Sequence, residues 1–266
     1  MGERREAPSR LTAAFPADRA ALITYLMAGY PDRETSLASL RAATRAGADV
    51  IELGVPFGDP LADGPVIAGA AKVAREQAGG FGLAESIALA AELIADSESA
   101  HMPPLVLMTY LNPLMRFGLP RAAEAVRVAG IAGVIVPDMP PEAAGPWLAV
   151  SAGLDTIFLA APTSTDERLA VVAATSVGFL YCVSATGVTG ERAEMAEGLE
   201  VLVARIKAHT ELPIAVGFGV STPEQAAEVS RIADGVIVGS AIVKRQCDSA
   251  EVEGFVRSLR VAMDGS

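Results

Sequence analysis

Three carboxylates stand close together in the segment IELGVPFGDPLADGP, residues 51–65. Strand alternation places Glu52 on the face opposite to Ile51 and Leu53. The branched apolar face is expected to pack against helices, which leaves Glu52 pointing into the barrel that the strands are predicted to form, near its upper rim. A carboxyl group shielded from water has a raised pKa and can exchange a proton near neutral pH. The alternative is a structural glutamate bound to a buried arginine or to backbone N–H groups, but the long loop that follows this strand favours the acid–base interpretation.

Asp59 and Asp63 follow in the loop DPLADGP. Both also fit ordinary turn chemistry, since an aspartate before proline or glycine is common in turns and Pro65 can begin a helix. Spacing alone does not rank these two aspartates as a partner for Glu52.

Glycine-rich motifs end three later strands. They are TGVTG (186–190), GFG (217–219) and GS (239–240). In parallel barrels, loops after the last two strands commonly bind phosphate through backbone N–H groups. Each motif alone fits a tight turn, but the ordered set indicates a phosphate site. No Arg or Lys lies within these motifs, so backbone amides would have to hold the anion.

Bulky side chains lie near the ends of other predicted strands. They are Tyr25, Tyr110, Ile135, Tyr181 and Phe218. Each could belong to an ordinary core. Together they predict a flat apolar ligand above the strands, with its anionic part toward the last two strands.

Several catalytic devices lack the residues they need. Both histidines, His101 and His209, precede strands and are expected far from the C-terminal strand ends, so a histidine-ligated catalytic metal is not expected. Lys72 and Lys207 belong to helical patterns and Lys244 follows the last strand, so no lysine is suited to a Schiff base.

Strand patterns alternate with Ala-rich helical patterns along the whole chain. The predicted strands are 21–29, 50–56, 104–111, 133–138, 155–162, 178–185, 213–220 and 234–243. Such alternation requires parallel strands joined by crossover helices. We therefore predict one α/β domain over residues 1–266, a (β/α)8 TIM barrel with residues 1–19 as an N-terminal extension. A doubly wound sheet is the alternative, but no GxGxxG motif follows the first strand.

Composition agrees with one compact, soluble globular domain. The chain has 266 residues, 51% of them hydrophobic, and a formal net charge of −11, which disfavours a nucleic-acid surface. Cys182 and Cys247 are far apart in the sequence, as expected of reduced cysteines rather than of a disulfide or zinc site. The N-terminus lacks the apolar segment of a secretory signal, and no membrane span is predicted. A cytoplasmic location is expected.

The motifs IELGVPFGDPLADGP, LMTYLNP, VIVPDMP, SATGVTG, GFGVSTPEQ and VIVGSAIV closely resemble the tryptophan synthase α-chain family, in unbroken order over residues 20–262. The resemblance implies a (β/α)8 barrel lyase that cleaves indole-3-glycerol phosphate into indole and glyceraldehyde 3-phosphate without a cofactor.

The resemblance also implies roles for individual residues. Glu52 matches the acid–base glutamate that protonates indole C3 and accepts the glycerol hydroxyl proton, and Asp63 matches the aspartate that binds the indole N–H. Asp59 is then interpreted as a turn or partner-contact residue. The other matches are the lid residue Thr189, the phosphate residues Gly190, Gly219, Gly239 and Ser240, and the indole walls Tyr25, Tyr110, Ile135, Tyr181 and Phe218.

Family α chains normally pair with a pyridoxal-phosphate-dependent β chain in an α2β2 heterotetramer. The contact is implied to involve the loop after the second strand and the region around Asn112. Gly58 stands where the family usually has serine, and Ala68 where it usually has glutamine. These departures leave open a stand-alone lyase that releases free indole. A non-catalytic activating subunit is a further alternative, disfavoured because the carboxylates and glycines are intact.

Overall fold

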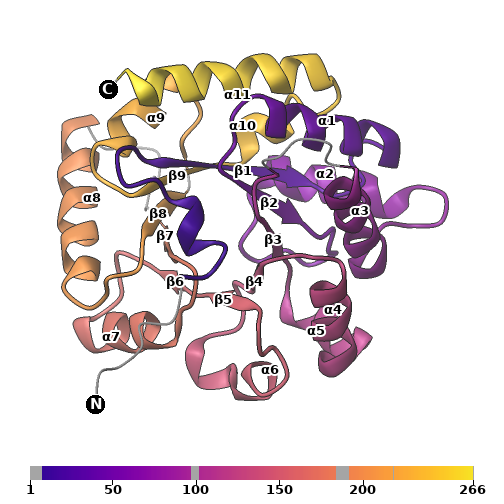
Figure 1. Ribbon diagram of the computed structural model, residues 1–266, viewed down its shortest axis with the longest axis horizontal. Coiled ribbons are helices and arrows are strands. Elements are labelled where there is room, and N and C mark those ends of the chain that lie inside the picture. The colour runs from indigo at the N-terminus through magenta and orange to yellow at the C-terminus, as the bar shows by residue number, and fades with distance from the viewer. Residues whose placement is uncertain (1–7, 97–101, 184–191, 218, 266) are drawn as a thin grey trace.

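A computed structural model describes residues 8–96, 102–183, 192–217 and 219–265 of the chain. Parallel strands form the centre of this part of the chain (Figure 1). The strands are β1 (Ala21–Met27), β2 (Val50–Gly54), β3 (Leu105–Met108), β4 (Gly133–Ile135), β5 (Asp155–Ile157), β6 (Leu159–Ala160), β7 (Leu180–Val183), β8 (Ile214–Gly217) and β9 (Gly235–Val238).

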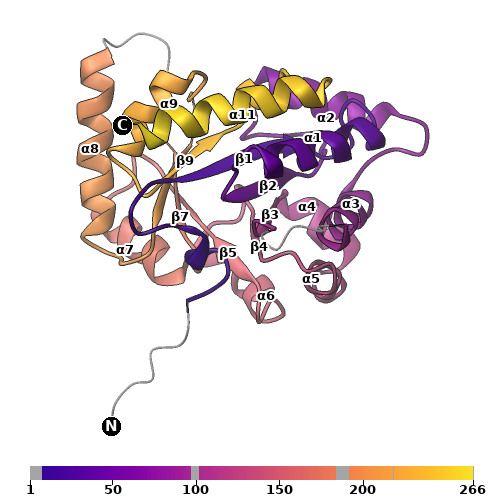
Figure 2. The same ribbon diagram turned by 45° about the horizontal axis from the view of Figure 1, so that its top comes forward.

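Helices surround the strands on the outside (Figures 1 and 2). They are α1 (Arg33–Arg45), α2 (Pro65–Glu76), α3 (Leu83–Ala95), α4 (Leu111–Phe117), α5 (Leu119–Val128), α6 (Gly145–Leu148), α7 (Asp166–Thr175), α8 (Arg192–Lys207), α9 (Pro223–Ser230), α10 (Ser240–Val243), α11 (Ser249–Asp264) and the short 3-10 helices η1 (Thr12–Ala14) and η2 (Pro141–Ala143). Within the described ranges, none of the helices has the length and apolar character needed to cross a membrane.

Capping side chains begin several of these helices. The carboxylate of Asp32 accepts the N–H of Thr35 at 2.8 Å at the start of α1. Thr222 caps α9 in the same way, and proline occupies the first turn of α2 and of α9. These residues satisfy N–H groups that a helix leaves free at its N-terminus.

The sheet closes on itself at the fifth predicted strand. Its order is β5-β4-β3-β2-β1-β9-β8-β7-β6, and only Phe158 separates β5 from β6 in the chain. β5 pairs with β4 and β6 pairs with β7, so one short segment joins both ends of the sheet. The predicted (β/α)8 barrel is therefore confirmed, because the two ends of the sheet meet on one continuous segment of the chain and the structural relatives share the fold.

Several predicted strand boundaries were wrong. The predicted strand 155–162 is interrupted at Phe158, and the segment 234–243 contains β9 followed by helix α10 rather than one long strand. The segment 104–111 ends as a strand at Met108, and Leu111 begins α4. Short buried apolar runs have no periodicity that separates a strand from a helix, which explains these errors.

Alternation along the strands separates two apolar layers. Val50 belongs to the barrel interior, where Ile23, Val106 and Ile237 also lie. Ile51 belongs to the layer between strands and helices. The predicted orientation of β2 is thus confirmed, and Glu52 shares the interior face with Val50.

The N-terminal segment closes the end of the barrel at which the strands begin. Leu11 is fully buried in the interior cluster, and the ring of Phe15 lies 5.4 Å from that of Phe179. The hydroxyl of Thr12 donates to the carbonyl of Gly178 at 2.7 Å. A side chain at Gly235 would collide with Phe15, since a Cβ there would lie 2.7 Å from its ring. Ligands are therefore expected to enter from the opposite, C-terminal end.

Asp49 connects β2 to both ends of the chain. Its carboxylate accepts from Arg19 at 2.7 and 2.8 Å, from the N–H of Leu22 at 2.8 Å and from Arg260 of α11 at 3.2 Å. Its side chain is only 13% exposed. Loss of this carboxylate would leave two cations without their shared partner.

We expect Asp49→Ala to lower the free energy of unfolding by about 3 kcal/mol, because the mutation breaks a mostly buried charged network. Chemical denaturation followed by circular dichroism measures this change. Glu253→Ala is the matched control, since Glu253 pairs with Arg45 and Arg257 on the surface. Equal denaturation midpoints for the two variants would contradict the role given to Asp49.

Candidate active site

Strand β2 holds the Glu52 carboxyl inside the barrel. Glu52 is fully buried and pairs in register with Tyr25 of β1 and Val106 of β3. Within the described residues, neither carboxylate oxygen has a hydrogen-bond partner. The alternative of a structural glutamate bound to arginine or backbone amides therefore finds no support in this part of the chain.

The pKa of Glu52 is raised from 4.5 to about 8. Burial is the larger cause of this rise, and the negative charge of Asp63 is the smaller one. Burial also raises the pKa of Asp63 from 3.8 to about 6, against a hydrogen bond from Tyr110 that lowers it. At neutral pH, Glu52 therefore holds a proton while Asp63 is ionised. Two carboxyl groups whose pKa values differ in this way suit the roles of an acid and its charged partner.

The two loop aspartates differ in their surroundings. Asp63 is half-buried and contacts Tyr110, whereas Asp59 is exposed on the same loop. The charge of Asp63 also raises the pKa of Glu52, so these surroundings favour Asp63 over Asp59 as its partner.

Tyr110 organises the loop that carries Asp63. Its hydroxyl accepts the N–H of Ala62 at 3.0 Å and donates to the Asp63 carboxylate. Its ring stacks on that of Phe57, with centroids 5.2 Å apart and planes 29° apart. Sequence reasoning did not assign a role to Phe57, because a single aromatic residue in a loop has no periodic pattern to identify its partner.

Tyr25 and Tyr181 lie over glycines of neighbouring strands. A Cβ on Gly54 would overlap the hydroxyl of Tyr25, and one on Gly217 would overlap the hydroxyl of Tyr181. Burial raises the pKa of both phenols, and the charges of Glu52 and Asp63 add to this rise. Both tyrosines therefore share one electrostatic environment with the two carboxyl groups.

The glycines were a missed signal. A glycine inside a strand often marks a close approach of another group, and Gly54 follows Glu52 on the same face of β2. Ile135, the remaining described wall residue of β4, is fully buried in the barrel interior.

The predicted phosphate residues divide between described and undescribed parts of the chain. Gly219 has a positive φ of 87°, which favours glycine, just after β8. Gly239 follows the neighbouring strand β9 and caps α10, whose first residue is Ser240. Because β8 pairs with β9, these three residues follow the ends of two neighbouring strands. Thr189, Gly190 and Phe218 lie outside the described residues.

No group of three or more His, Cys, Asp or Glu side chains that could hold a metal ion occurs in the described residues. His209 is exposed after α8, and His101 lies outside the described residues. Cys182 is buried and Cys247 exposed, and both are free thiols. Among the described residues, the ionisable groups of the candidate site are the carboxyl groups of Glu52 and Asp63 and the phenols of the tyrosines.

A barrel of parallel strands with two neighbouring carboxyl groups of raised pKa is typical of the class of barrel enzymes whose sites lie at the C-terminal strand ends. A profile of the family described as tryptophan synthase alpha chain matches residues 11–262. The tryptophan synthase alpha chain of Dehalococcoides mccartyi is 44% identical over 262 residues, covering 96% of this chain and 100% of the relative. That of Gluconacetobacter diazotrophicus is 48% identical over 255 residues, covering 92% and 90%.

Solved structures agree with the sequence comparisons. A chain of tryptophan synthase from Mycobacterium tuberculosis superposes with a TM-score of 0.87 at 40% identity, covering 97% of this chain and 99% of that one. Tryptophan synthase subunit alpha from Legionella pneumophila superposes with a TM-score of 0.88 at 31% identity, covering 98% and 100%. The chain belongs to the tryptophan synthase α-chain family.

Membership makes the chain a carbon–carbon lyase of tryptophan biosynthesis and the α subunit of a two-chain enzyme. The family reaction is the cleavage of indole-3-glycerol phosphate. The alternatives of a stand-alone lyase and of a non-catalytic subunit are not favoured by these relationships.

The raised pKa of Glu52 predicts a cost in stability. Because the folded pKa of about 8 exceeds the unfolded value of 4.5, the protein loses stability as pH rises through that window. At about 1.4 kcal/mol per pKa unit, the loss is on the order of 5 kcal/mol above the window. Glu52→Gln lacks this ionisation, so its advantage in free energy of unfolding should grow between roughly pH 5 and pH 9.

Denaturant titrations of both proteins at each pH measure this difference. Glu76→Gln, an exposed change on α2, is the control and should differ from the native protein by the same amount at each pH. A constant advantage of Glu52→Gln over the whole range would show that the Glu52 carboxyl is not desolvated.

Tyr110→Phe is expected to raise the pKa of Asp63 by roughly one unit, because the variant removes a hydrogen bond to the carboxylate and keeps the ring. Carboxyl titration by carbon-13 NMR, assigned with Asp63→Asn, measures the shift. Tyr181→Phe removes a phenol that has no hydrogen bond to Asp63 among those described and should give a smaller change. An unchanged pKa in Tyr110→Phe would refute the hydrogen bond.

Proposed function

We propose that Glu52 and Asp63 are the acid–base pair with which this α chain cleaves indole-3-glycerol phosphate into indole and glyceraldehyde 3-phosphate. The observation that carries the proposal is the pair of pKa values, about 8 for the buried Glu52 and about 6 for Asp63. Glu52 enters the reaction protonated and Asp63 enters it charged.

The reaction is a retro-aldol cleavage that adds a proton to indole C3 at one end of the broken bond and removes the hydroxyl proton from the carbon at the other end. Protonated Glu52 gives its proton to indole C3, which creates a cationic ring. The Asp63 carboxylate accepts the indole N–H and stabilises that cation. The Glu52 carboxylate then takes the proton of the glycerol hydroxyl, the carbon–carbon bond breaks, and its electron pair returns to the ring. Indole and an aldehyde leave, Glu52 is protonated again, and no water is consumed.

Substrate binding would use the two sides of the barrel mouth. The indole ring is proposed to be surrounded by Tyr25, Tyr110, Ile135, Tyr181 and Phe218. The four of these residues that the structure describes are buried, which supports this proposal. The phosphate is proposed to bind Gly190, Gly219, Gly239 and Ser240. The positive φ of Gly219 beside the start of α10 supports that side. Thr189 is proposed to close over Asp63 and exclude water.

The partner is proposed to be a β chain that carries pyridoxal phosphate, in a cytoplasmic α2β2 assembly, while this chain itself uses no cofactor. Leu61 on the loop after β2 is 80% exposed and Met115 on α4 is 62% exposed, which suits a surface covered by another chain. The same loop contains Gly58, where a Cβ would lie 2.8 Å from the guanidinium of Arg75. A serine at this position would displace Arg75, so this chain differs locally at the proposed contact.

Glu52→Gln tests the mechanism. We expect kcat for indole release to fall by roughly 10²–10⁴-fold, since the amide cannot transfer the proton, while the calorimetric dissociation constant of indole-3-glycerol phosphate changes little. Asp59→Asn on the exposed part of the loop is the control and should keep most of the activity. Normal turnover by Glu52→Gln would refute the role of this residue.

A further inference from the structure

Gln246 is a buried polar side chain outside the proposed catalytic residues. Gln246 is fully buried and lies in the segment that follows α10. The side-chain oxygen accepts the N–H of Met27 at 3.0 Å. The side-chain nitrogen donates to the carbonyl of Met27 at 2.6 Å and to that of Tyr30 at 2.9 Å. Every polar atom of this amide therefore reaches the end of β1 or the loop after it.

The amide takes the place of a missing strand. In a parallel strand, alternate residues bond to opposite neighbours. Ala21 faces β9, because its N–H donates to Asp234 at 2.9 Å, whereas Ala28 faces β2 through Gly54. Met27 shares the β9 side with Ala21, but the pairing with β9 ends at Thr24 and Val238. Beyond that point the chain turns into α10, and the Gln246 side chain supplies both a donor and an acceptor to Met27.

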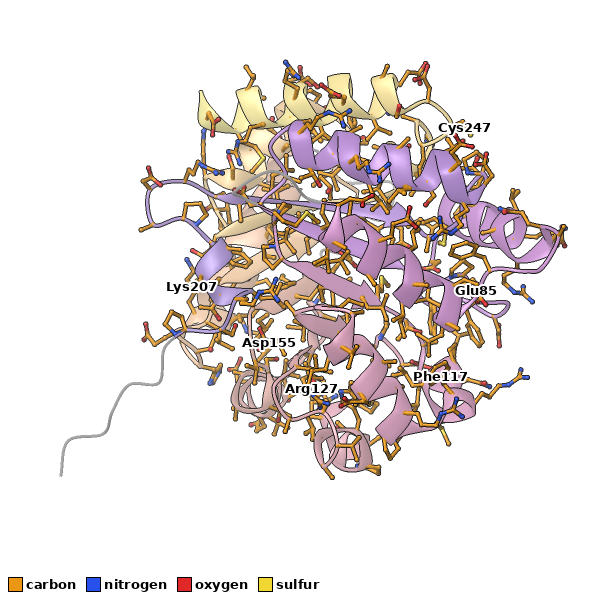
Figure 3. All side chains as sticks on the ribbon, turned by 45° about the vertical axis from the view of Figure 1, so that its right-hand side comes forward. Glu85, Phe117, Arg127, Asp155, Lys207 and Cys247 are labelled. Carbon is orange, nitrogen blue, oxygen red and sulfur yellow. The ribbon has the colours of Figure 1, made fainter. Side chains whose placement is uncertain are left out.

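Gln246 also connects this junction to helix α1. Its backbone carbonyl accepts the hydroxyl of the buried Ser39 at 3.0 Å. On the other side of α10, a Cβ on Gly239 would lie 3.5 Å from the Cβ of Tyr25, so the end of β9 packs directly against β1. α10 lies beside β1 (Figure 1). Cys247, next to Gln246, lies at the upper right of the view in Figure 3, whereas Lys207 lies at the left.

We propose that Gln246 is a positioning residue that sets the distance between the two ends of the substrate site. By continuing the hydrogen bonding of β1, it holds the start of α10, with Gly239 and Ser240, against the strand that carries Tyr25. Because β1 pairs with β2, the same contact fixes α10 relative to Glu52. This inference rests on the proposed function, in which α10 binds the phosphate and Glu52 acts on the indole.

Gln246→Met tests the inference, since methionine has a similar volume and lacks the amide groups. Two competitive inhibitors separate the two ends of the site: glycerol 3-phosphate for the phosphate end and indole for the ring end. We expect the inhibition constant of glycerol 3-phosphate and the KM for indole-3-glycerol phosphate to rise about tenfold. A displaced α10 would lose about one hydrogen bond to the phosphate, and the loss of one such bond weakens binding by about this factor. The inhibition constant of indole should stay within about twofold, and kcat should fall less than KM rises.

Gln77→Met is the matched control. The amide of Gln77 donates to the carbonyls of Gly29 at 2.5 Å and Pro31 at 2.6 Å, so it holds the same loop from α2 rather than from the α10 segment. This variant should leave both inhibition constants unchanged. A comparable rise in the glycerol 3-phosphate constant in Gln77→Met would assign the effect to loosening of the loop and overturn the inference.

Equal changes of both inhibition constants in Gln246→Met, or no change of either, would also overturn it. If Gln246→Met does not fold, Ser39→Ala decides, because it removes only the hydrogen bond to the Gln246 carbonyl. We expect a rise of roughly two- to fivefold in the glycerol 3-phosphate constant alone, and no change would overturn the inference. Failure of the proposed function would instead appear as a native protein that does not release indole.

Discussion

The burial of an unpaired carboxyl group is the constraint on which the rest of the site depends. Glu52 occupies the interior of β2 without a hydrogen-bond partner among the described residues, and its pKa is about 8 as a consequence. Ionising this unpaired group inside the barrel is costly, so the Glu52 carboxyl is protonated at neutral pH. The barrel tolerates this cost because two buried apolar layers stabilise the fold elsewhere. One layer lies between the strands and the helices, and the other lies inside the barrel. The same desolvation that weakens the fold gives the carboxyl a pKa suited to proton transfer.

The groups around Glu52 tune this environment without neutralising it. Asp63 adds a negative charge that favours the protonated form of Glu52, and Tyr110 keeps Asp63 ionised by donating to it. Tyr25 and Tyr181 lie over Gly54 and Gly217, and burial raises the pKa of both phenols even further above neutral pH. The two carboxyl groups therefore have different protonation states at neutral pH, for reasons that lie in their local surroundings.

Much of this arrangement could be predicted from the sequence because it depends on periodicity. Alternation of apolar residues gives the orientation of Glu52, and alternation of strand and helix gives the barrel. Contacts between distant segments have no such period. Nothing local in the sequence specifies the hydrogen bond from Tyr110 to Asp63 or the stacking of Phe57 on Tyr110. The same holds for the hydrogen bonds between Gln246 and Met27, which are 219 positions apart. The interruption of the fifth strand at Phe158 arises from closure of the whole sheet, which is equally invisible to local patterns. The choice between Asp59 and Asp63 needed either the family resemblance or the folded loop.

The most direct test of the central claim is the titration of the Glu52 carboxyl carbon by carbon-13 NMR, in the native protein and in Asp63→Asn. A midpoint near pH 8 in the native protein, moving to lower pH when the charge of Asp63 is removed, is the predicted result. A midpoint near the ordinary value of 4.5 in both proteins would contradict it, because Glu52 would then be ionised at neutral pH and could not serve as the proton donor.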